Sequence, residues 1–169
     1  MNIQQRILPV LALFGTGLCG SVAADPVSHL DFYVYTHVQQ QGQMTFAPDE
    51  WAGTRGQQLR LESLAVTPLH PNLGNWPSCL QLSYMAHLQG TGDTGWTNAP
   101  NKVGTEGQSR RIEGVAFRLA GSCAQDYTVE YRCHLQNIGD SALLRDGQFC
   151  GSRGQSRQLE AIKLTVRHK

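Results

Sequence analysis

Apolar and polar residues alternate with a period of two along several stretches of the chain, a pattern typical of β-strands with one buried face. In the stretch nearest the carboxyl end, one face carries a glutamate and three apolar residues: Glu160, Ile162, Leu164 and Val166. Stretches that begin at Glu62 and Glu113 repeat this order. Turn-forming clusters such as TGDTG at 91–95 separate the stretches. The pattern predicts an all-β chain, because helical spacing fits none of these segments better.

One phrase occurs three times, as GTRGQQLRLESLAV at 53–66, GTEGQSRRIEGVAF at 104–117 and GSRGQSRQLEAIKL at 151–164. A strand-like segment with a histidine precedes each copy, and the histidine stands 25, 26 and 26 residues before the glutamate of its phrase. A spacing this regular does not arise three times by chance. The residues common to the copies are His37, His87, His134, Gln57, Gln108, Gln155, Glu62, Glu113 and Glu160.

We interpret these shared residues as structural, because each of the three units needs the same residues to form the same strands and turns. The alternative is that the glutamates accept hydrogen bonds from sugar hydroxyls. A buried carboxylate needs partners, which we expect from turn amides or from Arg60 and Arg111, two residues before the first two glutamates. The histidines are expected to be neutral and hydrogen-bonded between strands rather than gathered into a zinc site. Each Gly-Gln pair predicts a turn with positive φ at glycine and glutamine bonded to nearby backbone.

The repeats predict a single pseudo-threefold domain, with units at about 30–68, 78–120 and 124–167. One unit has a single apolar face and cannot bury it alone, so the units should close around a common axis. With about four strands each, they would form about twelve strands. We expect a β-prism of three sheets, and a β-trefoil is the alternative. An open solenoid fits less well, because the chain has no polar capping repeats.

Residues 1–24 have the features of a signal peptide, and the domain would span 25–169. The protein is therefore expected to be exported, to the periplasm or beyond, with no membrane span left after cleavage. The mature part holds four cysteines, Cys79, Cys123, Cys133 and Cys150, which permit three pairings. We pair the last two within the third unit, and the first two as a link between the starts of units two and three. Metal ligation is not expected, because no C-x-x-C pair is present.

The net charge is +1, which argues against nucleic acid as a partner. The sequence contains neither a GxSxG elbow nor an HExxH motif, and strong internal symmetry is more typical of binding than of catalysis. We therefore expect no enzyme activity and no cofactor.

Trp96 is the best candidate for contact with a ligand, since an aromatic face beside polar side chains suits a sugar ring. The candidate ligand-binding residues are Trp96, Asp93, Thr97 and Asn98. The alternative is a tryptophan folded back onto the sheet. We interpret Trp51 and Trp76 as packing within linkers.

The runs from Tyr84 to Leu119 and from Tyr131 to Leu164 resemble the clostridial hydrophobic tryptophan (ChW) repeat, although only the second unit keeps the Gly-Trp pair, at Gly95-Trp96. The resemblance, extended to three repeats, implies an exported bacterial protein with a cell-surface or carbohydrate-binding role. We therefore predict a lectin-like module that binds carbohydrate or a cell-envelope polymer. The alternative is a secreted factor that binds a protein partner, such as an inhibitor or a toxin-associated subunit.

Overall fold

The computed structural model describes residues 29–70 and 72–169, so the predicted signal peptide at 1–24 lies outside the described residues. The described chain forms fourteen strands. Its helical content is one 3₁₀ turn at Ala124–Asp126, and it holds no helix with the length and apolarity to cross a membrane. The prediction of an all-β fold is confirmed.

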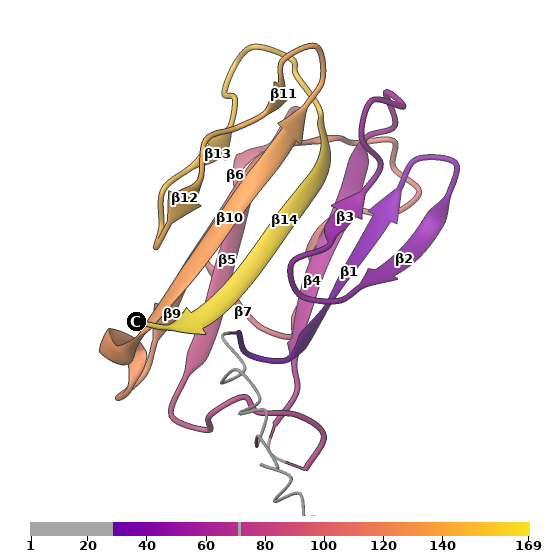
Figure 1. Ribbon diagram of the computed structural model, residues 1–169. Coiled ribbons are helices and arrows are strands. Elements are labelled where there is room, and N and C mark those ends of the chain that lie inside the picture. The colour runs from indigo at the N-terminus through magenta and orange to yellow at the C-terminus, as the bar shows by residue number, and fades with distance from the viewer. Residues whose placement is uncertain (1–28, 71) are drawn as a thin grey trace, which may run out of the picture.

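Each unit contributes two long antiparallel strands to the molecule (Figure 1). These pairs are β1 (Phe32–Val38) with β4 (Leu61–Pro68), β5 (Gln81–Leu88) with β9 (Ile112–Ala120), and β10 (Tyr127–Leu135) with β14 (Leu159–His168). Shorter strands pair with the opening strand of their own unit: β2 (Gly42–Phe46), β6 (Gly92–Asp93), β7 (Thr97–Asn98), β11 (Gly139–Asp140) and β12 (Leu144–Arg145).

One short strand of every unit leaves its own sheet and joins another. β3 (Trp51–Gly53) of the first unit pairs with β14 of the third, and β13 (Cys150–Gly151) of the third pairs with β9 of the second. β8 (Val103–Gly104) of the second unit pairs with β4 of the first. This strand exchange is cyclic, because each unit gives one strand and receives one.

The resulting architecture is three antiparallel sheets with the orders β2-β1-β4-β8, β13-β9-β5-β6 and β11-β10-β14-β3. In addition, β7 pairs with β5 in the second of these sheets, and β12 pairs with β10 in the third. A β-trefoil would contain a closed barrel, and the described strands form three separate sheets instead. The expected three-sheet arrangement therefore fits better than the alternative, with two strands more than the anticipated twelve.

The inward faces of the three sheets form one core. The alternation predicted for the long strands is confirmed, since Val34, Tyr84 and Tyr131 are buried at equivalent inward positions. Phe117 lies 5.8 Å from Tyr84 and 5.0 Å from Tyr131 between ring centroids, and so joins the second unit to the third. Burial raises the pKa of the Tyr131 hydroxyl to about 12, and this hydroxyl donates to the Gln148 carbonyl.

The segment between the first two units is anchored by Trp76, which is fully buried. Its indole N–H donates to the Leu80 carbonyl at 3.0 Å, and its ring packs edge-on against Phe32. The interpretation of this tryptophan as linker packing agrees with the structure.

Both predicted disulfides are present. Cys79–Cys123 connects the starts of the second and third units, and Cys133–Cys150 lies in the core. The second bond joins β10 to β13, the strand that the third unit gives to its neighbour.

Candidate functional site

The repeated glutamate occupies a β-bulge in every unit. The register between the long strands passes from His37↔Ser63 to Val38↔Leu61 and so leaves Glu62 without an opposite residue. The same slip leaves out Glu113 and Glu160 in the other two units. An extra residue of this kind bends the strand and increases its twist, and here it also exposes a backbone carbonyl to the neighbouring unit.

The exchanged strand meets the neighbouring unit at that carbonyl. The N–H groups of Thr54, Thr105 and Ser152 donate to the carbonyls of Glu160, Glu62 and Glu113 at 2.9, 2.8 and 2.9 Å. The glycine before each of these donors has positive φ, and a Cβ there would overlap the same carbonyl oxygen. The opening Gly-Thr or Gly-Ser of the phrase therefore binds the glutamate of a different unit.

The carboxylates of these three glutamates are buried and have the expected kinds of partner. Arg60 Nε donates to Glu62 at 2.9 Å, and Arg111 Nε donates to Glu113 at 2.8 Å. The third unit has no arginine two residues before Glu160, and the turn amide of Gly56 donates to that carboxylate at 3.1 Å. The predicted pairing with arginine or turn amides is confirmed.

The three histidines lie on the outward faces, each in its own sheet. His37 Nδ1 lies 3.1 Å from Glu62 Oε2. His87 and His134 instead contact the aspartate opposite them, at 2.5 Å from Asp93 and 2.6 Å from Asp140. Among residues 29–70 and 72–169, no three His, Cys, Asp or Glu side chains are grouped closely enough to hold a metal ion.

The Gly-Gln turns were predicted only in part. Gly56, Gly107 and Gly154 have φ of 69°, 70° and 69°, as expected. The glutamine side chains are exposed, however, and Gln155 accepts a hydrogen bond from Arg157 Nε rather than from backbone. The expected bond to backbone is wrong because glycine and the residue after glutamine both adopt positive φ, which leaves glutamine at the tip of the turn.

The four predicted ligand-binding residues lie in one segment around β6 and β7. Trp96 is 39% exposed, and the Arg118 guanidinium lies 4.1 Å from its ring centroid. The Asp93 carboxylate accepts hydrogen bonds from two nitrogens of Arg153, Nε and Nη2, and is also contacted by His87.

These contacts favour the ionised form of Asp93. The hydrogen bond from Arg153 lowers the pKa of the carboxyl below its ordinary value, against the effect of burial and with help from His87. The Asn98 amide oxygen accepts from Ser83, and Thr97 pairs opposite buried Tyr84. Asp93 and Asn98 therefore already have hydrogen-bond partners within the protein, and Trp96 is contacted by Arg118.

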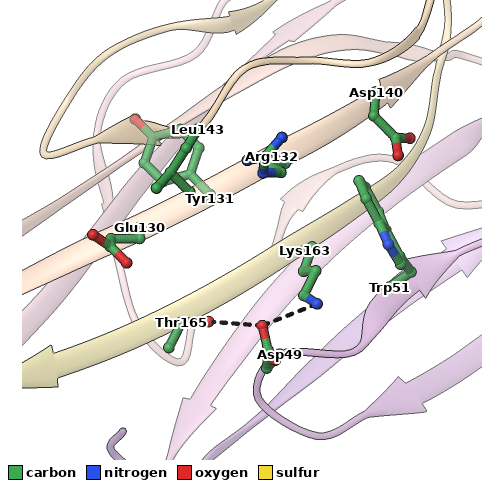
Figure 2. Close-up of a pocket in the computed structure, with 9 residues that line it drawn as sticks. All are labelled: Asp49, Trp51, Glu130, Tyr131, Arg132, Asp140, Leu143, Lys163 and Thr165. Carbon is green, nitrogen blue, oxygen red and sulfur yellow. Dashed lines mark hydrogen bonds and ion pairs between the residues drawn. The ribbon is translucent and has the colours of Figure 1, made fainter. Parts of the chain in front are cut away.

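A hollow of about 360 Å³ lies on the outward face of the sheet β11-β10-β14-β3 (Figure 2). We call it the Trp51 hollow. Its lining residues are Asp49, Trp51, Glu130, Tyr131, Arg132, Asp140, Leu143, Lys163 and Thr165. The strand register places Arg132, Lys163 and Trp51 in one row across three strands, so the hollow spans the seam between the first and third units.

Paired charges and a hydroxyl line this hollow together with the tryptophan. Lys163 Nζ lies 3.1 Å from Asp49 Oδ1, and the Thr165 hydroxyl donates to the same oxygen at 3.4 Å. Arg132 donates to the Ser141 carbonyl at 3.1 Å.

Two acids of the Trp51 hollow, Asp140 and Glu130, have a lowered pKa. Burial alone would raise the pKa of the Asp140 carboxyl, but His134 and Arg55 hold it below its ordinary value. Arg145 and Arg167 do the same for Glu130, again against burial. The hollow thus offers fixed donors and acceptors beside an indole ring.

The interpretation of Trp51 as linker packing is wrong. It belongs to the exchanged strand β3, opposite Lys163 and edge-on to His134 at 6.4 Å between ring centroids. One face of its ring is contacted by Arg55, 4.6 Å from the centroid. No sequence signal marked it, because β3 has only three residues and its partner β14 belongs to another unit.

Residues 87–121 and 134–167 match the model of the family described as Clostridial hydrophobic W, or ChW. The chain carries two ChW repeats. Each matched stretch begins at the histidine opposite an aspartate, His87 or His134, and extends into the closing strand of its unit. The first unit lies outside the matched residues, although β1 and β4 have the same bulge. No curated protein and no solved structure matches the chain.

Proposed function

We propose that this ChW-repeat protein is an exported, non-enzymatic module that binds a carbohydrate, free or as part of the cell envelope, in the Trp51 hollow. The observation that carries the proposal is the position of Trp51, which pairs opposite Lys163 in a surface hollow of about 360 Å³ that Asp49 and Thr165 also line. Small-molecule sites combine apolar or aromatic walls with a few fixed polar groups in this way.

The chemistry of a pyranose suits such a lining. One face of many sugar rings presents C–H groups that pack on an indole, while the hydroxyls at the rim both donate and accept hydrogen bonds. Lys163 and Arg132 supply donors, and Asp49 and Glu130 supply acceptors. Because these groups are already held by neighbours, little side-chain ordering accompanies binding.

Export is supported by the two disulfides, because such bonds persist in oxidising compartments outside the cytosol. The Cys133–Cys150 bond is buried, so it is part of the folded core rather than an accessible redox pair.

The test is an array of bacterial-envelope and plant oligosaccharides probed with the full chain and with single variants. We expect Trp51→Ala to lose at least tenfold in affinity, with Trp51→Tyr keeping part of it. Arg132→Ala and Lys163→Met should weaken binding by smaller factors. Thermal melting of each variant separates lost contacts from lost fold.

Trp96→Ala distinguishes the Trp51 hollow from the segment predicted by sequence, because the two tryptophans lie over different sheets. We expect this variant to bind, and loss confined to it would move the site to β6 and β7. If the array gives no signal while a pull-down retains one stoichiometric protein, the protein-interaction alternative replaces the proposal. Cleavage of a bound oligosaccharide, seen by mass spectrometry, would contradict the non-enzymatic assignment.

A further inference from the structure

A second hollow of about 260 Å³ lies on the sheet β2-β1-β4-β8. We call it the Tyr35 hollow, and its lining residues are Tyr35, Thr36, Gln43, Ser63, Ala65, Lys102 and Glu106. It is formed by the first unit and by the strand that the second unit gives to it, β8, with the residues that flank this strand.

The two hollows occupy equivalent places in their sheets. Gln43 stands opposite His37 just as Asp140 stands opposite His134, and Tyr35 precedes its histidine by two residues just as Arg132 does. Ala65 pairs with Tyr35, and Lys163 pairs with Arg132. On the exchanged strand, Lys102 precedes the buried Val103 as Trp51 precedes the buried Ala52. The four matched positions line both hollows.

The two hollows also contain the same types of side chain, an aromatic ring and a lysine, although these stand at different strand positions. The Trp51 hollow takes its aromatic ring from the exchanged strand and its lysine from the sheet, whereas the Tyr35 hollow takes its ring from β1 and its lysine from the residue before β8. In each case the lysine pairs with a carboxylate, at 3.1 Å for Lys163–Asp49 and 2.8 Å for Lys102–Glu106.

Polar groups complete the Tyr35 hollow. The Ser63 hydroxyl donates to Glu106 at 2.9 Å, and this bond together with the larger effect of Lys102 lowers the pKa of the Glu106 carboxyl. The amide of Gln43 adds a donor and an acceptor on the side of β2.

The third sheet differs at the same positions. Its equivalents of Tyr35 and Ala65 are Met85 and Ala116, which are 7% and 2% exposed although they face outward. Phe149 takes the place of Trp51 and packs on Gly114. Trp96 stacks with Arg118 on the outward side of this sheet. Large side chains therefore fill the place that is open on the other two sheets.

We infer that the Tyr35 hollow is a second saccharide site, so that one chain binds two saccharide strands at once. The inference rests on the proposed function, because it assigns to the Tyr35 hollow the same ligand class as to the Trp51 hollow. The two hollows lie on different sheets of the cyclic arrangement, and separate polymer strands can therefore occupy them.

The test is the stoichiometry of binding, measured calorimetrically with cellohexaose, chitohexaose and mannohexaose on the full chain. With the hexaose that binds, we expect two sites per chain for the wild type and one for each of Tyr35→Ala, Lys102→Met and Trp51→Ala. Tyr35→Ala combined with Trp51→Ala should leave none. Leu73→Ser is the matched control, because Leu73 is 81% exposed and lines neither hollow, and it should keep both sites.

Cross-linking gives a second readout that a purely structural role would not produce. The wild type should make solutions of the corresponding long polysaccharide turbid, whereas a folded single-site variant should bind the polymer without turbidity. One site per chain that survives Tyr35→Ala and Lys102→Met would overturn this inference and leave the proposed function intact. If none of the hexaoses or the array sugars binds, both fail together.

Discussion

Gly104 lies in the donated strand β8, where the backbone of the second unit approaches the backbone of β4 in the first unit. Its φ is +93°, and a Cβ would overlap the carbonyl oxygen of Glu62. Gly107, three residues on, also has positive φ, of +70°, but has open space around it. The same motif thus contains one glycine needed for close approach and one needed only for its backbone conformation.

These two glycines give a matched pair of substitutions. We expect Gly104→Ala to lower the free energy of unfolding by about 3 kcal/mol or more, because overlap adds to strained φ. Gly107→Ala should lower it by only about 1 kcal/mol. Urea titration followed by far-UV circular dichroism measures both. Equal losses for the two variants would contradict a close approach at Gly104.

Asp93 and Arg153 predict a dependence of stability on pH. The pKa of Asp93 is lowered in the folded protein, so its contribution is present above the unfolded pKa, about 3.9, and is lost as pH falls through the folded pKa. Arg153→Met should therefore destabilise the protein at about pH 6 and make less difference at about pH 2. Both groups are almost half exposed, which limits the effect to under about 1 kcal/mol.

Arg110→Met is the control for this experiment, since Arg110 donates to the Thr91 hydroxyl rather than to a carboxylate. Its effect on the free energy of unfolding should be the same at both pH values. An Arg153→Met effect that is undiminished at about pH 2 would show that Arg153 acts by stacking on Phe149, 3.5 Å from the ring centroid, rather than by its charge.

The long strands were predictable from sequence because each carries enough residues to display alternation, as β14 does over Leu159–His168. The disulfides followed from where the cysteines stand in the repeats. The exchanged strands were not predictable, since β8 and β13 have two residues each and show no period. Their partners lie in other units, and local sequence does not specify which unit a short strand joins.

The hollows were missed for the same reason. Trp51 lies next to a lysine 112 residues away only because β3 pairs with β14. Trp96 was predicted as a ligand contact instead, because polar residues flank it along the chain. Sequence could not show that Arg153 binds Asp93 and that Ser83 donates to Asn98.

The disulfide Cys79–Cys123 ties two units together, and we expect its removal by Cys79→Ser with Cys123→Ser to cost about 3–4 kcal/mol by the chain-entropy model. The comparison is the double variant Cys133→Ala with Cys150→Ala. The Cys133–Cys150 bond closes a shorter loop, but its removal leaves a void in the core. Guanidinium titration gives both values. A loss below about 1 kcal/mol for the first pair would show that the two unit starts are held by other contacts.

At the scale of the whole molecule, the cyclic exchange makes the units depend on one another for folding. A chain of residues 78–169 would lack β3 beside β14, and its β8 would have no β4 to join. We expect this two-unit chain to remain unfolded by circular dichroism. The full chain should unfold in one transition, with the same midpoint by tryptophan fluorescence. A folded two-unit chain would contradict the interdependence.

The strand exchange also fixes how many units this three-sheet domain can hold. A stack of repeats with free ends can grow by adding a copy, because the new copy meets one exposed neighbour. In this protein every receiving strand already holds a donated one. A fourth copy could enter only by opening an existing pairing, so gain or loss of one repeat would require a different architecture rather than a longer form of this one.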